Sequence, residues 1–151
     1  MARITWLQRA RCDKGAQLIE FSLVFPLLLL VGLGIIDFGF MFQRYEVVTN
    51  AAREGARVAV LPGYAQADVT ARVTQYLAAG GATGTPTVTY QPPQAVDVGG
   101  VCMTLTGVTV ALPHGFNVVG PLVALFGRPA LTARNLTATA WMRYEGAAVS
   151  C

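Results

Sequence analysis

Few side chains in this 151-residue chain have the types and spacing that catalysis or metal binding requires. His114 is the only histidine, and a single histidine between a proline and a glycine is far more often solvated than catalytic. No second histidine or close cysteine pair offers a zinc site, and the sequence has no nucleophile elbow, P-loop or glycine-rich dinucleotide fingerprint. Glu20 and Asp37 cannot act as a catalytic pair, because about 25 Å of helix would separate them. We therefore expect no enzymatic activity, no cofactor and no metal.

The composition instead indicates a membrane protein. Hydrophobic residues make up 54% of the chain and charged residues only 13%, which is too apolar for an ordinary soluble domain and suits one membrane-spanning element. The net charge of +3 comes largely from four basic residues within the first fourteen positions: Arg3, Arg9, Arg11 and Lys14. Such a basic start is a topology signal, so we expect no nucleic-acid partner.

An apolar run extends over residues 18–42 and is interrupted only by Glu20 and Asp37. As a helix it would be about 37 Å long, enough to cross a hydrocarbon core of about 30 Å. Both acids lie near the ends of the run, where we expect interfacial water to reach them. The positive-inside rule places the N-terminus in the cytoplasm and the residues beyond about 45 outside. Glu20 is the more unusual acid, since a carboxylate drawn to the bilayer centre costs about 2.5–3.5 kcal/mol.

A glycine stands just before this run, with Glu20 and Phe21 five and six residues after it. This spacing, Gly15-Ala16 followed by Glu-Phe at the mouth of an apolar segment, is the pattern of a type IV prepilin-like cleavage site. Its position between a basic leader and a membrane helix makes the pattern more specific. It predicts processing between Gly15 and Ala16.

Two other interpretations of the N-terminus stay open. An ordinary secretory signal would have a similar basic start, but the apolar core is long and no clear A-x-A site follows it. An uncleaved signal anchor explains the hydrophobicity and the topology, but it does not explain the spacing of the glycine and the Glu-Phe pair. A secreted periplasmic enzyme, a third class, lacks a supporting set of residues.

The helix is expected to continue beyond the membrane through residues 43–60, which contain no proline, and to end at Leu61-Pro62-Gly63. Small residues recur every four positions along it at Ala51, Gly55 and Ala59. Such a stripe allows another helix to approach closely, so we expect it to mark a helix contact with a partner. The alternative is a solvated helix whose alanine-rich face is buried in the chain's own domain.

The segment from Gly15 to Val60 resembles the TadE-like family, the minor pilins or pseudopilins of the bacterial tight-adherence (Tad, Flp-type) pilus. The resemblance lies in GAQLIEFSLVFPLLLL, IIDFG and TNAAREGAR, and the strand-like LTATAWMRYE at residues 136–145 is similar to the usual end of the family. It implies a non-enzymatic subunit that a prepilin peptidase cleaves after Gly15. Its other partners would be sibling Tad pilins and the assembly platform of the inner membrane.

The resemblance also implies an assembly mechanism. After cleavage, Glu20 would be the fifth mature residue and would pair with the new N-terminal amine of a neighbouring subunit, with Phe21 beside it. Pairing in an apolar bundle would penalise an unpaired charge and so favour one register. We expect a single-pass inner-membrane protein with its C-terminal domain in the periplasm, which becomes extracellular if the subunit enters the pilus.

The remaining sequence predicts an α+β domain. We expect a leader over residues 1–15, a transmembrane and extended helix over 16–61, and an extracytoplasmic domain over 62–151. Within this domain the pattern predicts one helix and about three antiparallel strands. The helix covers residues 65–79, with Val69, Val73, Tyr76 and Leu77 on one face, and the strands cover residues 87–90, 101–112 and 131–144. Pro92-Pro93 and Gly99-Gly100 are interpreted as turns, and residues 120–127 as a short apolar helical turn.

The expected topology places the three cysteines on different sides of the membrane. Cys12 lies in the cytoplasmic leader, whereas Cys102 and Cys151 would both be outside, in a compartment that forms disulfides. A bridge between the latter two would close a loop of about 50 residues and stabilise the domain by about 4 kcal/mol on the chain-entropy model. Two free or intermolecularly paired thiols are the alternative.

Overall fold

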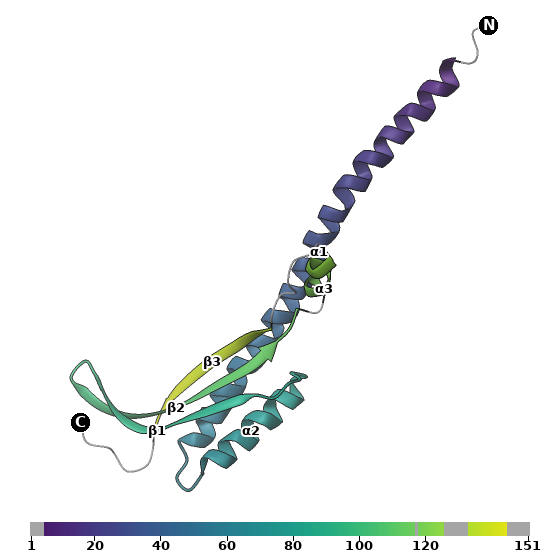
Figure 1. The fold of residues 1–151 in the computed structure, drawn as a ribbon. Coiled ribbons are helices and arrows are strands. Elements are labelled where there is room, and N and C mark those ends of the chain that lie inside the picture. The colour runs from purple at the N-terminus through teal and green to yellow at the C-terminus, as the bar shows by residue number, and fades with distance from the viewer. Residues whose placement is uncertain (1–4, 117, 126–132, 145–151) are drawn as a thin grey trace.

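One long helix dominates the molecule. The structure, a computed structural model, describes residues 5–116, 118–125 and 133–144. Helix α1 (Thr5–Ala59) is 55 residues long, stays helical through Pro26, and projects from a small domain built around its C-terminal end (Figure 1). The chain leaves the helix where Leu61-Pro62-Gly63 was expected to end it, and Gly63 adopts a positive φ of 90° that a side chain would disfavour.

The small domain contains a three-stranded antiparallel sheet. Its strands β1 (Thr87–Val98), β2 (Val101–His114) and β3 (Arg134–Arg143) lie in the order β1-β2-β3. Gly99 and Gly100, both at positive φ, form the tight turn between β1 and β2, as the sequence predicted. The central strand is β2, so it pairs along both edges.

The interpretation of Pro92-Pro93 as a turn is wrong. The two prolines lie inside β1, where the pairing with β2 shifts register between Gln91 and Gln94. Proline has no backbone N–H to donate to a ladder, so a bulge on an edge strand is one of the few places in a sheet that accepts it. Strand β1 therefore continues eight residues beyond the predicted end at Tyr90.

Helix α2 (Gln66–Ala79) packs against α1. The carboxylate of Asp68 accepts a hydrogen bond from the backbone N–H of Ala65 at 2.9 Å, which satisfies one donor at the start of the helix. Val69, Val73 and Leu77 are buried, as their spacing predicted. Tyr76 was expected on the same face but is 36% exposed.

The core forms where α1 and α2 cover one face of the sheet. Alternate residues of β2 point into it, namely Val108, Val110 and Leu112. The part of α1 that faces them carries small residues, so the helix axis lies close to the sheet. This arrangement of a long apolar helix, one further packed helix and a three-stranded antiparallel sheet confirms the α+β prediction.

A third helix, α3 (Val119–Leu125), lies apart from the core. It follows β2 and sits beside the projecting part of α1 rather than over the sheet (Figure 1). The sequence suggested a short helical turn here. Its position beside α1 could not be inferred from local pattern.

Candidate functional site

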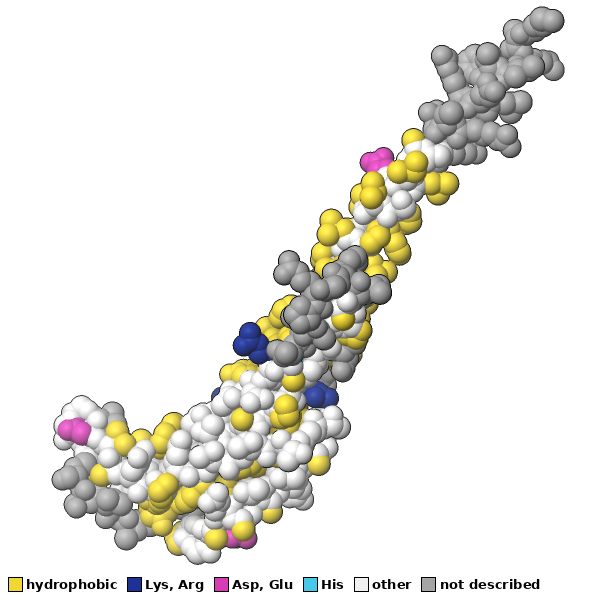
Figure 2. Space-filling view, in the orientation of Figure 1, with side chains coloured by type: hydrophobic (Ala, Val, Ile, Leu, Met, Phe, Trp, Pro, Cys, Tyr) yellow, Lys and Arg dark blue, Asp and Glu magenta, His cyan; other side chains and the backbone are white. Residues whose placement is uncertain are grey.

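The projecting part of α1 exposes an almost purely apolar surface. Leu23 is 74% exposed, Leu27 64% and Ile35 68%. Hydrophobic side chains cover this part of the helix on the face drawn in Figure 2. The helix is long and apolar enough to cross a membrane, and none of its most apolar window is buried within the protein. Burial in a bilayer is the environment that such a surface requires, which supports a membrane location.

The predicted processing residues lie within this helix. Gly15 and Ala16 belong to the continuous run of α1, and a Cβ placed on Gly15 would meet no atom within 4 Å. Glu20 is exposed, and no hydrogen bond or ion pair joins it to another described residue. Phe21 is 61% exposed and stacks on Phe25 with ring centroids 5.2 Å apart. The carboxylate is thus available to a group from outside the chain.

The small-residue stripe is occupied by the chain's own domain. Ala51 and Ala59 are buried, and a Cβ on Gly55 would lie 2.6 Å from Cγ2 of Val73 and 3.2 Å from Cγ1 of Val108. The close approach that the stripe permits is therefore made by α2 and β2. A contact of these residues with a partner helix stays a prediction, and it would require α2 to move away.

Glu54 joins the two packed helices. Its carboxylate accepts hydrogen bonds from Arg72 of α2 at 2.6 and 3.1 Å, and it also contacts Arg57 on the next turn of α1 at 3.4 Å. The hydrogen bond from Arg72 holds the pKa of Glu54 below its usual value, against an opposing effect of burial. This pairing links α2 to α1 beside their buried apolar contact.

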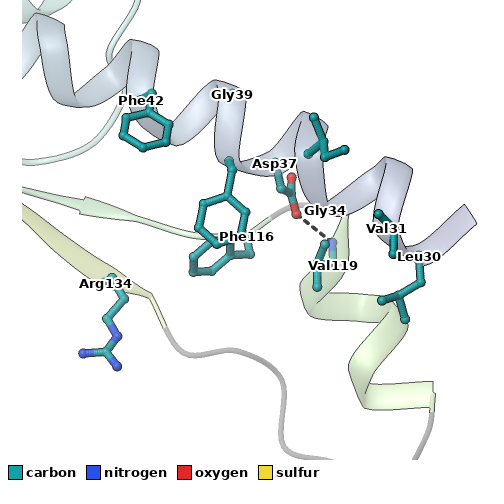
Figure 3. Close-up of a pocket in the computed structure, with 11 residues that line it drawn as sticks. Leu30, Val31, Gly34, Asp37, Gly39, Phe42, Phe116, Val119 and Arg134 are labelled. Atoms are coloured by element: carbon teal, nitrogen blue, oxygen red, sulfur yellow. Dashed lines mark hydrogen bonds between the residues drawn. The ribbon is translucent and has the colours of Figure 1, made fainter. Parts of the chain in front are cut away.

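Asp37 is the main residue that the sequence analysis misplaced. It was expected to meet interfacial water, but it is only 3% exposed. One carboxylate oxygen, Oδ2, accepts hydrogen bonds from the backbone N–H groups of Val118 and Val119, at 3.1 and 2.7 Å. Figure 3 shows the bond to Val119. These donors lie at the start of α3, more than 80 residues away in sequence, so no local motif could have revealed the contact.

A cavity of about 790 Å³ opens beside Asp37. It is lined mainly by apolar side chains of α1, from Leu30 to Phe42, and is completed by Phe116, Val119 and Arg134 (Figure 3). Asp37 is already used by α3, the other α1 side chains in the lining offer no polar groups, and Arg134 is the one further charged residue among the described lining residues. The cavity is suited to hydrocarbon rather than to a polar substrate.

His114 is buried, contrary to the expectation of a solvated loop residue. It ends β2, is 3% exposed and meets Phe116 edge-on with ring centroids 5.7 Å apart. Its Nδ1 has no hydrogen-bond partner among the described residues. Burial lowers the pKa of His114, and the positive charge of Arg44 adds to this effect, whereas Asp37 opposes it.

The cysteine prediction falls partly outside the described residues. Cys102 is the second residue of β2 and is disulfide-bonded, and its partner sulfur is not among the described side chains. Cys151 itself lies outside the described residues. The bridge between these two therefore stays a prediction.

Across the part of the chain that the structure describes, no group of three or more histidine, cysteine or acidic side chains could hold a metal ion.

Comparison with known proteins finds a match to the model of the TadE-like protein family over residues 15–57. No curated protein and no solved structure matches the chain. The matched family is structural and non-enzymatic, and it suggests a pilin related to the Tad pilus. The match covers the apolar run and two residues of the small-residue stripe, Ala51 and Gly55, and it confirms that residues 15–57 form a TadE-like segment.

Proposed function

We propose that the protein is a minor pilin or pseudopilin of a Tad (Flp-type) pilus. In this proposal a prepilin peptidase removes residues 1–15, and the mature chain contributes to assembly, to initiation or to the tip. The N-terminus lies in the cytoplasm and the sheet domain in the periplasm. The observation that carries the proposal is the TadE-like match, which starts at the glycine that precedes the predicted cut.

The surroundings of Glu20 support an intermolecular role. An ionised carboxylate at the edge of an apolar segment is unfavourable unless it is paired. No described group of the same chain pairs with Glu20, whereas cleavage would create a free amine on Ala16 of each neighbouring subunit. The two charges would meet as the helices leave the bilayer and bundle, and the penalty for leaving either unpaired would select one register.

A second candidate is an uncleaved single-pass anchor whose periplasmic domain binds another protein. One observation favours it: α1 begins at Thr5, so the bond between Gly15 and Ala16 lies inside a continuous helix. A peptidase would first have to unwind this turn, because a scissile bond must leave its helical hydrogen bonds to enter a protease cleft. A glycine at the cut lowers that barrier, since glycine disfavours helix by about 1 kcal/mol relative to alanine.

The mass of the mature N-terminus separates the two candidates. Processing between Gly15 and Ala16 supports the pilin, whereas an intact start supports the anchor. We expect Gly15→Leu to block processing in cells that contain an active prepilin peptidase, and to leave the full-length chain in the inner membrane.

Gly32→Leu is the matched control. It also lies on α1, and a Cβ there meets no atom within 4 Å, so both substitutions add the same side chain to an open helix surface. Immunoblotting should show normal maturation for Gly32→Leu only. A normal mature band from Gly15→Leu would contradict the cleavage proposal.

A further inference from the structure

We propose that α3 is immersed in the outer half of the lipid bilayer, beside the transmembrane part of α1. The sheet domain would then enter the membrane at a second point instead of standing clear of it. The occupant of the apolar surface around α3 is lipid acyl chain. The inference requires that α1 spans a membrane, but it requires neither cleavage nor pilus assembly.

The depth of α3 follows from its contacts on α1. A span of about 30 Å takes about 20 helical residues, and this window must fit within residues 18–42. If the window ends at Asp37, Leu30 lies about 10 Å inside the outer boundary; if it ends at Phe42, Leu30 lies about 18 Å inside, close to the mid-plane and thus at the deep limit of the outer half. Leu30 and Val31 line the cavity together with Val119 of α3. The part of the cavity that Leu30 and Val31 line is therefore within the hydrocarbon in either register, and Val119 of α3 faces the same cavity.

The composition of this segment fits that depth. Neither the first nor the last turn of α3 carries a charged residue. In the sequence no charged residue occurs between His114 and Arg128. Segments this short do not cross a bilayer, and an apolar helix of this length at membrane depth lies within one leaflet.

Asp37 makes the insertion chemically consistent. The first N–H groups of a helix lack partners within it, and hydrocarbon offers no water to replace them. The Asp37 carboxylate accepts from two of these groups, Val118 and Val119. In return, the two donors satisfy a carboxylate that would otherwise stand unpaired in an apolar helix. The hydrogen bonds thus lower the cost of placing both the Asp37 carboxylate and the start of α3 in the bilayer.

Lipid is favoured as the occupant because the cavity beside α3 is continuous with the exposed apolar surface of α1. Leu30, Val31 and Phe38 line the cavity and also belong to the membrane-spanning run. Ala124 of α3 is exposed, whereas Val119 lines the cavity beside α1, so this helix presents side chains outward as well as toward α1. A bilayer that surrounds α1 at this level would necessarily surround α3 too.

Depth-dependent fluorescence quenching of the full chain tests the proposal. The two natural tryptophans are replaced in a Trp6→Phe, Trp141→Phe background, and one tryptophan is introduced at a time. Ala124→Trp is the test variant. Leu23→Trp, which belongs to the span in either register, reports contact with acyl chains, and Leu61→Trp, which follows the outer end of α1, reports water. Each protein is reconstituted into phosphatidylcholine vesicles with or without bromine on the acyl chains.

We expect brominated lipid to remove most of the emission of Ala124→Trp and Leu23→Trp and to leave Leu61→Trp unchanged. Aqueous acrylamide should give the reverse order. If Ala124→Trp follows Leu61→Trp instead, α3 lies in water and the proposal is overturned while the membrane span stands. If neither quencher reaches Ala124→Trp, protein covers α3 and the proposal is also overturned. If lipid does not quench Leu23→Trp, both the span and the immersion fail.

A second set of variants tests the role of Asp37 as a positioning residue. Adding Asp37→Ala to the Ala124→Trp protein removes the acceptor for Val118 and Val119, so we expect lipid quenching to fall to the level of Leu61→Trp. Asp37→Asn keeps an acceptor oxygen, and quenching should be largely retained. Full lipid quenching in the Asp37→Ala protein would show that insertion does not depend on the carboxylate.

Discussion

The two halves of α1 differ in the surroundings that cover their apolar residues. From Gly15 to about Phe42 its side chains are large, apolar and exposed, and nothing within the described domain covers most of them. From Val48 to Ala59 its buried positions are small, mostly alanine and glycine, and α2 and the sheet cover them. Hydrophobicity separates these halves, because charged residues recur beyond Phe42, but it does not say what covers the apolar positions of each half. The size of the residues does.

The physical reason is that the two surroundings pack differently. Acyl chains are fluid and fill the space between large side chains, so a lipid-facing helix gains from bulk. A protein neighbour is rigid, and it gains contact when small residues let the backbones approach. Residue size along an apolar helix thus indicates whether lipid or protein will cover it.

Of the changes considered, substituting one glycine from each half of α1 should give the largest difference in the stability of the outer domain. Gly55→Leu would drive a side chain into Val73 and Val108, and we expect overpacking to cost about 1–3 kcal/mol or more. Gly32→Leu meets open space and should leave the unfolding of the outer domain unchanged. Chemical unfolding of both proteins in detergent micelles would measure the difference. Equal stabilities would break the comparison between the halves.

Acidification should destabilise only the domain end of the molecule. The pKa of His114 is lowered from 6.5, so the folded state binds fewer protons than the unfolded state. Stability is then complete above pH 6.5 and falls as the pH is lowered from there through the depressed value. We expect His114→Gln to flatten this part of the stability profile. An unchanged slope in the variant would mean that another group titrates.

A smaller loss is expected from Arg72→Ala, which removes the ion pair with Glu54. The Arg72 side chain is 43% exposed, and pairs at such sites contribute up to about 1 kcal/mol. The loss should shrink as salt is added, because salt screens exposed charges. Arg53→Ala, at an exposed position on α1, is the control. A salt-independent loss would point to packing of the arginine stem instead.

Glu20→Ala should have the smallest effect on stability and a large one on assembly. The exposed Glu20 carboxylate has no partner among the described residues, and its removal eases membrane insertion. We therefore expect a normally inserted and folded protein that no longer enters the pilus. Fractionation of sheared filaments would measure this. Wild-type incorporation of the variant would contradict the proposed pairing.

The sequence predicted those parts of the fold that depend on local pattern. The apolar length of α1, its end at Leu61-Pro62-Gly63 and the turn at Gly99-Gly100 follow from composition, breakers and positive φ. The central strand followed from its alternating aliphatic residues. Each of these features is decided by the residues of its own segment, so a single sequence contains the information.

The features that the sequence missed are tertiary. Asp37 was assigned to interfacial water, because its partners Val118 and Val119 come from a segment more than 80 residues away. His114 was assigned to a loop, although strand pairing carries β2 as far as that residue. Burial of the small-residue stripe was left open between a partner and the chain's own core, since close-packing residues look the same in both settings.

The continuity of α1 also fixes the direction of Glu20 around the helix axis relative to the outer domain. The helix runs unbroken between Glu20 and Asp37, and at 3.6 residues per turn these two carboxylates leave the axis about 100° apart. Since Asp37 is held against α3, the direction of Glu20 around the axis is set by the outer domain. Rotation of that domain about the axis of α1 would rotate Glu20 with it. A contact made outside the membrane can therefore orient a carboxylate near the inner face of the membrane.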